Sequence, residues 1–199
     1  MTAVPAATTP STDSRADLAA FLPPPAHPPV AGTEVEMLLG ELERVRGYVR
    51  WKCSGVDADG MRKRLGPSAL TLGGLLKHLA LVEDHWFGVR LHGRPASEPW
   101  ASVDFDADPE WEFRTAADDS PDELLALWEA SCEASRRRLA EALADGGLDR
   151  QAAFTWGDGR TPDTRRIVVD MVEEYARHLG HIDLLRENVD GLTGEDPGE

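Results

Sequence analysis

Four segments of this chain repeat apolar residues at steps of three and four, and this periodicity restricts the fold more than any other feature of the sequence. Such spacing places the apolar side chains on one face of an α-helix. The segments run from Thr33 to about Ser54, from near Thr71 to His92-Gly93, from Ser120 to about Ala144, and from about Asp163 to Asn188. Amphipathic helices bury their apolar faces against each other. The sequence therefore predicts an all-α four-helix bundle, with no strand pair and no internal repeat.

Two of these helices begin with capping signals. Thr33 followed by Glu36 fits a capping box, in which each side chain accepts a hydrogen bond from the backbone amide of the other residue. The run from Ser120 to Glu123 places a cap residue, a proline and an acidic first turn in the usual order. We therefore expect one helix to start after Thr33 and another after Ser120.

The remaining sequence divides into two ends and a long internal connection. Residues 1–32 are rich in Pro and Ala and are predicted to form a flexible tail, with a short helix at Asp17 to Phe21. Residues 33–192 are assigned to the bundle and residues 193–199 to a flexible C-terminus. Residues 94–120 have no sustained period and form a connection long enough to act as a lid. At 199 residues, the chain has room for one substantial core, so we expect one domain.

Charge and cysteine content exclude several classes of function. The chain has 36 acidic and 21 basic residues and a formal charge of −15, which repels nucleic-acid phosphates and anionic membranes. No apolar run approaches the roughly 20 residues that span a bilayer. The two cysteines, Cys53 and Cys132, are not in a CxxC spacing, so no disulfide framework is implied. We expect a cytoplasmic protein without nucleic-acid or membrane partners.

The last helical segment carries ionisable residues on its inward stripe. Glu174, His178 and His181 follow Ile167 and Met171 at steps of three and four, beside a second stripe that is apolar. A glutamate at such a position is unfavourable unless it is paired or bound to a metal. The stripe is therefore a candidate site for chemistry.

The second helical segment supplies a facing histidine. His78 lies three residues after Leu75 and four before Val82, so it also points inward. His85 is two turns further along, on the order of 10 Å away, which is too far to share an ion with His78. We assign His85 to the wall of the site.

These residues are suited to one divalent metal ion. Residues four apart on a helix converge, so Glu174 and His178 can reach an ion that His78 approaches from the facing helix. His181 is a candidate fourth ligand, or a residue that orients substrate. Two imidazoles and one carboxylate suit Zn²⁺, Ni²⁺ or Fe²⁺ better than Ca²⁺ or Mg²⁺. The competing interpretations are a core histidine at position 78 and a structural ion pair between Glu174 and His178.

Other side chains favour structural roles. The arginines at positions 136–138 have acidic neighbours at helical spacing and are predicted to form a solvated face. Trp51, Trp86 and Trp128 are expected in the core. Cys53 and Cys132 lack a basic neighbour of the catalytic kind and are expected to be inert.

Two segments around these histidines resemble the DinB-like superfamily. They are LGGLLKHLA with EDHWF, at residues 72–80 and 83–87, and EEYARHLGHIDLLRE, at residues 173–187. The resemblance covers most of residues 33–192 and is greatest to the actinobacterial mycothiol-transferase-like branch. It implies a four-helix bundle that binds a divalent metal, with dimers common among relatives.

The resemblance also assigns the ligands. The matching positions are His78, Glu174 and His178. Many relatives have histidine in place of Glu174, and the mycothiol-dependent maleylpyruvate isomerase branch has glutamate there. His181 stands where relatives often have Gln or Asp, and Asp170 stands where they often have His, which changes the surroundings of the ligands.

These observations lead to an expected function and two alternatives. The leading expectation is a metal-dependent transferase that moves a low-molecular-weight thiol, such as mycothiol, onto a small electrophile in stress or detoxification, with His181 or His85 as proton acceptor. A thiol-dependent isomerase of maleylpyruvate type would need cations near the metal, where only Arg177 and Arg186 are nearby and both are expected to face outward. The third reading is a non-enzymatic bundle that binds a metal or a ligand.

Overall fold

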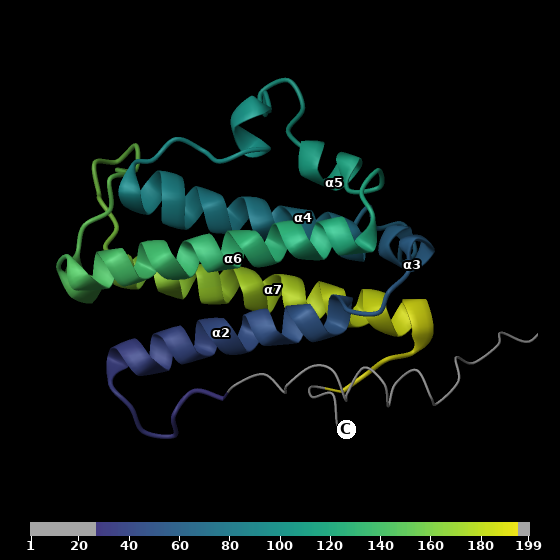
Figure 1. Cartoon of the computed structure of the whole chain (residues 1–199), viewed down its shortest axis with the longest axis horizontal. Coiled ribbons are helices and arrows are strands. Elements are labelled where there is room, and N and C mark those ends of the chain that lie inside the picture. The colour runs from purple at the N-terminus through teal and green to yellow at the C-terminus, as the bar shows by residue number, and fades with distance from the viewer. Residues whose placement is uncertain (1–26, 195–199) are drawn as a thin grey trace, which may run out of the picture.

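The computed structural model describes residues 27–194, and their long elements are all helices (Figure 1). No β-strand occurs in this range, where Gln151 and Asp163 form an isolated bridge. The bundle helices are α2 (Glu34–Cys53), α4 (Leu72–Glu83), α6 (Pro121–Ala144) and α7 (Thr164–Asp190). The predicted all-α four-helix bundle is confirmed. The expected helix at Asp17 to Phe21 and most of the expected tail lie outside the described residues.

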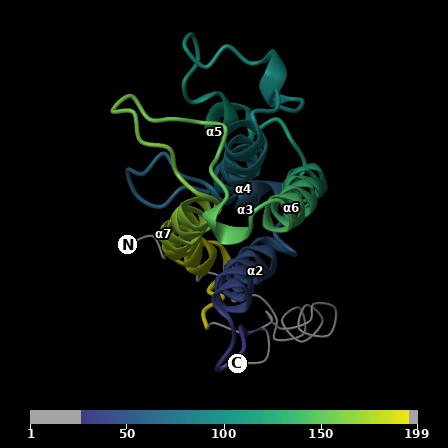
Figure 2. The same cartoon turned by 90° about the vertical axis from the view of Figure 1, so that its left-hand side faces the viewer.

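The bundle is arranged around a shared apolar core. End on, the four long helices surround one interior, with α2 packed chiefly on α7 and α4 on α6 (Figure 2). The core takes residues from every one of them, including the fully buried Val49, Leu79, Leu124 and Ile167. The expected core positions of Trp51 and Trp128 are confirmed, whereas Trp86 is only partly buried against the core.

The predicted helix starts are observed. Thr33 precedes α2, and its amide donates to the Glu36 carboxylate at 2.8 Å while its hydroxyl accepts from the Glu36 amide at 3.3 Å. Ser120 and Glu123 make the same reciprocal pair at the start of α6, at 2.8 and 3.3 Å. Each capping box satisfies amides that the first turn leaves without helical partners.

The second helical segment changes geometry halfway along. After Glu83 the chain continues as a π-helix, Asp84–Arg90, which places the Asp84 side chain inside the protein. Arg138 from α6 donates to Asp84 Oδ1 at 3.0 Å and is only 8% exposed. The prediction of a solvated face at positions 136–138 is therefore wrong for Arg138, because a buried carboxylate needs a cationic partner.

A polar cluster lies inside the otherwise apolar core. Arg46 of α2 donates to both carboxylate oxygens of Glu83, at 2.8 and 2.7 Å. Tyr175 donates to Glu83 Oε1 at 2.6 Å and accepts from the Trp128 indole at 2.9 Å. Cys132 lies against the same carboxylate, at 3.6 Å. This hydrogen-bonded set ties α2, α4, α6 and α7 together at the centre of the bundle.

Both cysteines are buried and unpaired, as expected. Burial raises the pKa of Cys53 to about 12, so its reactive thiolate form is scarce at neutral pH. Burial and the charge of Glu83 also raise the pKa of Cys132. The expectation that neither cysteine acts as a nucleophile agrees with these positions.

The 94–120 connection is more ordered than its sequence predicts. It contains the 3₁₀ turn Trp100–Ser102 and the helix α5 (Trp111–Thr115), which lies against α4 on the outside of the bundle (Figure 2). Lys77 of α4 contacts the connection at two places. Its Nζ lies 4.6 Å from the centre of the Trp111 ring and 2.5 Å from Asp119 Oδ2. The short helix α3 (Ala58–Arg62), also not predicted, joins α2 to α4.

None of the helices within residues 27–194 combines the length and hydropathy that crossing a membrane requires.

Candidate metal site

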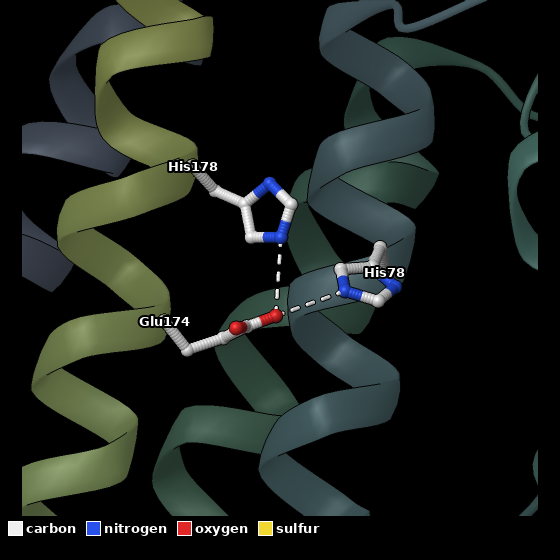
Figure 3. Close-up of side chains that lie close together, drawn as sticks. All are labelled: His78, Glu174 and His178. Carbon is white, nitrogen blue, oxygen red and sulfur yellow. Dashed lines mark hydrogen bonds and ion pairs between the residues drawn. The ribbon is translucent and has the colours of Figure 1, made fainter.

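Three predicted ligands meet between two helices. His78 projects from α4, and Glu174 and His178 project from α7 toward it (Figure 3). Glu174 Oε1 lies 3.2 Å from His78 Nε2 and 3.1 Å from His178 Nε2. One ligand atom from each residue falls within 4.8 Å of the other two. The convergence that the spacing predicted is therefore present in the structure.

The local sequence explains why these side chains point into one space. Leu75 and Leu79 are fully buried around His78, and Met171, Tyr175 and Ile182 are fully buried along α7. The packing of these apolar residues fixes the rotation of both helices about their axes. With that rotation fixed, the polar stripe lies at the edge of the core, facing α4.

The site remains open to solvent. The side chain of His78 is 19% exposed, that of Glu174 is 24% exposed and that of His178 is 13% exposed. A small molecule can therefore approach the ligand atoms, whereas a structural metal site is usually closed by four protein ligands. Partial burial also strengthens electrostatic interactions relative to those in bulk water.

The charges in the site are strongly coupled. Burial acts to lower the pKa of His78, but hydrogen bonds and charge from Glu112 and Glu174 outweigh it and raise the pKa to about 9. Hydrogen bonds from His178 and His78 hold the pKa of Glu174 well below its ordinary value. The Glu174 carboxylate lies against both imidazoles, and the same three groups converge as candidate metal ligands.

Glu112, which the sequence did not indicate as part of the site, contacts the side of the His78 ring that faces away from Glu174. It belongs to α5, and its Oε1 lies 3.1 Å from His78 Nδ1, the nitrogen opposite the one that faces Glu174. The neighbouring Phe113 stacks on the His78 ring, with centroids 5.0 Å apart and an angle of 22° between the planes. A carboxylate on the second nitrogen of a ligating histidine fixes its orientation and increases its basicity.

We expect Glu112→Gln to weaken metal binding about 10- to 100-fold, because the neutral amide keeps the shape of the side chain but removes the charge behind His78. Titration of the metal-free protein with Zn²⁺ against a competing chelator measures this change. Glu110→Gln is the matched control, since Glu110 is exposed and starts the same short helix. Equal Zn²⁺ affinity in the two variants would contradict the assigned role of Glu112.

His181 lies beside the ligand group and outside it. Its Nδ1 is 3.4 Å from His178 Nδ1, so it approaches the side of His178 that faces away from Glu174. It is not one of the residues whose ligand atoms converge. The contact places His181 where it orients His178, and its direct ligation of a metal stays a prediction.

His85 is occupied by a different partner. Arg90 Nε donates to His85 Nε2 at 2.7 Å, and the imidazole meets the Trp86 ring edge to face, with centroids 6.0 Å apart. Burial and then the Arg90 charge lower the pKa of His85. As the sequence indicated, His85 is not in the ligand group. Its role as proton acceptor stays a prediction.

The residues present fit a divalent cation. Two imidazoles and a carboxylate on facing helices form the donor set that bundle metal sites use. Glu112 supplies the carboxylate–histidine contact typical of such sites, and its Oε2 is buried without a hydrogen-bond partner among the described residues. The remaining coordination positions would be open to water or to a substrate.

Of the two arginines expected to face outward, one does so and the other is buried. Arg177 is exposed, bonded to Glu173 at 2.6 Å, and 4.0 Å from Glu174. Arg186 is only 1% exposed and donates to the Lys52 and Ser54 carbonyls, each at 2.8 Å. The expectation that Arg186 faces outward is therefore wrong, because those carbonyls at the end of α2 need a buried donor. Asp170 pairs with Arg166 at 2.7 Å and is not among the residues whose ligand atoms converge.

Comparison with known proteins agrees with the geometry. The family model described as mycothiol-S-transferase matches residues 37–191, which include the bundle helices almost completely and all three converging ligands. No curated protein and no solved structure matches the chain significantly. The description of this family names the transfer of mycothiol, a low-molecular-weight thiol. Because the match covers most of the sequence, the chain belongs to the mycothiol-S-transferase family.

Proposed function

We propose that the protein is a metal-dependent transferase that moves mycothiol, or a closely similar low-molecular-weight thiol, onto a small electrophile. The observation that supports this most directly is the partly exposed convergence of His78, Glu174 and His178 in a member of the mycothiol-S-transferase family. Zn²⁺ is the metal that this ligand set favours, with Ni²⁺ and Fe²⁺ as alternatives. The proposed role is detoxification in the cytoplasm.

The ligands prepare the thiol for attack. His78, Glu174 and His178 would hold a divalent ion, and its positive charge would favour the thiolate of a bound thiol, whose ordinary pKa is about 8.5. The convergence of His78 Nε2, His178 Nε2 and Glu174 Oε1 would determine where that charge lies. Glu112 holds the His78 ring from the opposite nitrogen, and Phe113 packs against its face. Preorganised positions of this kind avoid reorganisation during the reaction.

The group-transfer step is a nucleophilic substitution or addition. The thiolate sulfur forms a bond to the electrophilic carbon. In a substitution, the leaving group departs with its electron pair. In an addition, the π bond of the acceptor breaks, its electron pair moves to the neighbouring atom, and that atom takes a proton from solvent. The thiol proton leaves to solvent, which reaches the partly exposed ligands. His181 and His85 remain candidate acceptors for that proton, although each already has a ring nitrogen engaged, with His178 and with Arg90.

Consumption of mycothiol in the presence of a panel of electrophiles tests this proposal. The metal-loaded protein is expected to accelerate thiol loss and to form the corresponding thioether, whereas the chelator-treated protein is not. Acceleration that survives complete metal removal would contradict a metal-dependent mechanism. Metal binding without acceleration for any electrophile would favour a non-enzymatic metal-binding bundle.

The isomerase alternative and the dimeric state stay separate predictions. An isomerisation assay with a maleylpyruvate-type acid distinguishes the isomerase from the transferase. Of the two arginines first considered for holding such an acid, only Arg177 is exposed.

A further inference from the structure

A cavity lies next to the candidate metal site, and three arginines line it. It has a volume of about 370 Å³ and is formed between the link from α3 to α4 and the helix α5. Its charged lining consists of Arg62, Arg64, Arg114, Asp108 and Glu110. Three guanidinium groups against two carboxylates give this lining an excess of positive charge, although the whole chain carries −15.

The arginines retain capacity for an anionic ligand. Arg114 is paired with Asp108. Arg62 donates to the Ala117 carbonyl at 2.8 Å, which leaves its charge uncompensated by a carboxylate. The guanidinium of Arg64 has no hydrogen-bond or ion-pair partner within residues 27–194, and Glu110 forms no ion pair in that range either. Arg62 and Arg64, both exposed, are therefore the lining arginines without a carboxylate partner among the described residues, and an incoming carboxylate could pair with them.

Phe113 connects this cavity to the metal ligands. Its side chain lines the cavity and also stacks on the His78 ring, with centroids 5.0 Å apart. Thr71, at the start of α4, lines the cavity and precedes His78 by two helical turns, a rise of about 10 Å. His78, Glu174 and His178 do not themselves line the cavity, so an acceptor with its acid group in the cavity would have to span a distance of this order to place its reacting carbon near the ligands.

We propose that this cavity binds the carboxylate of the thiol acceptor, so that the protein prefers electrophiles that carry an acid group. The inference rests on the proposed transferase function and adds the substrate class. Phe113 contributes an apolar wall for the carbon skeleton, and Arg62 and Arg64 contribute the charge. The rest of the chain carries net negative charge and repels anions, so an anionic acceptor should favour this positively charged cavity over other parts of the surface.

The preference for acidic acceptors can be tested with two electrophiles that differ in charge and undergo the same substitution of chloride by the thiol. Chlorodinitrobenzene is neutral, and chlorodinitrobenzoate carries a carboxylate para to the chlorine. With either one, a carbon–sulfur bond forms, the carbon–chlorine bond breaks and chloride leaves, while the thiol proton passes to buffer. The measured quantity is kcat/KM for each acceptor with mycothiol, divided by its uncatalysed rate constant, in the metal-loaded protein.

Wild-type protein is expected to prefer chlorodinitrobenzoate, and Arg64→Ala should reduce that preference about tenfold, the loss expected for one charge-assisted hydrogen bond. Arg62→Ala should act in the same direction. Arg137→Ala is the matched control, since this exposed arginine pairs with Glu133 on α6 and does not line the cavity. A preference that Arg64→Ala and Arg62→Ala leave unchanged within twofold would overturn the anion site while leaving the transferase function in place.

A binding measurement that involves no reaction tests the carboxylate-binding cavity independently of the proposed transferase function. Dinitrobenzoate lacks the leaving group, and its binding to the full chain is measured by calorimetry. Binding by the wild type that weakens about tenfold in Arg64→Ala supports the anion site even if neither chloride acceptor reacts. No detectable binding of dinitrobenzoate to the wild type at millimolar concentration would overturn the site.

Discussion

Replacing His178 by alanine should weaken Zn²⁺ binding by at least about a hundredfold, and thiol transfer should fall with it. The substitution removes one of three convergent ligand atoms, and its imidazole also contacts Glu174 Oε1 at 3.1 Å. Loss of a residue that merely supports a ligand already costs about 10- to 100-fold, so loss of a ligand should cost more. Competition titration with a chelator measures the affinity.

His92→Ala is the control for that substitution. His92 bonds the Arg138 carbonyl at 2.8 Å and is not one of the converging residues. The His92→Ala variant should therefore keep wild-type Zn²⁺ affinity, although it loses one imidazole just as His178→Ala does. Full metal occupancy and full transfer activity in His178→Ala would contradict the assignment of His178 as a metal ligand.

Replacing Glu83 by alanine should lower the free energy of unfolding by about 3–5 kcal/mol, which is the largest stability effect expected in the bundle. The substitution removes the buried carboxylate that accepts two hydrogen bonds from the Arg46 guanidinium, which is only 2% exposed, and leaves Glu43, at 2.6 Å, as its remaining acidic partner. It also removes the acceptor of the Tyr175 hydroxyl, which donates to Glu83 at 2.6 Å. Urea unfolding followed by circular dichroism measures the loss.

A paired substitution distinguishes lost charge pairing from a general packing defect. Glu83→Leu combined with Arg46→Met removes both charges and should recover much of the stability lost in Glu83→Ala, because apolar groups of similar volume often replace a buried pair without cost. A single variant that loses less than about 1 kcal/mol would contradict the assigned importance of the pair.

The same pair determines how stability responds to acid. Burial raises the pKa of Glu83, but the charge and hydrogen bonds of Arg46 outweigh burial and lower it below the ordinary value. The stabilisation is therefore fully present above the unfolded-state pKa, about 4.3, and is lost as pH falls through the folded-state pKa. This contribution does not change between neutral and mildly alkaline pH.

Much of the fold was predictable because periodicity and capping are local properties of the sequence. The apolar spacing located the four long helices, and Thr33 and Ser120 marked two starts within one residue. The π-helical geometry after Glu83 was not predicted, because it keeps the same apolar residues and changes only the backbone hydrogen bonds. Its consequence, the burial of Asp84 with Arg138, was therefore missed as well.

The site was predictable to the extent that its residues belong to regular helices. Steps of four and three placed Glu174, His178 and His78 on inward faces, and the structure brings these residues together. Glu112 and Phe113 were missed because they lie on α5, a helix of five residues in a segment without sustained period. Their side chains reach His78 through tertiary packing, for which the sequence offers no spacing signal. The cavity that Arg62 and Arg64 line was not predicted either, because tertiary packing brings these residues next to α5.

Elemental analysis of the purified protein, beside a variant that combines His78→Ala with His178→Ala, tests the central claim most directly. The site predicts about one zinc, nickel or iron per chain in the native protein, with zinc favoured, and loss of that metal in the folded variant. Absence of metal from both samples, together with failure to reconstitute the native protein with any of the three ions, would contradict the proposed metal site.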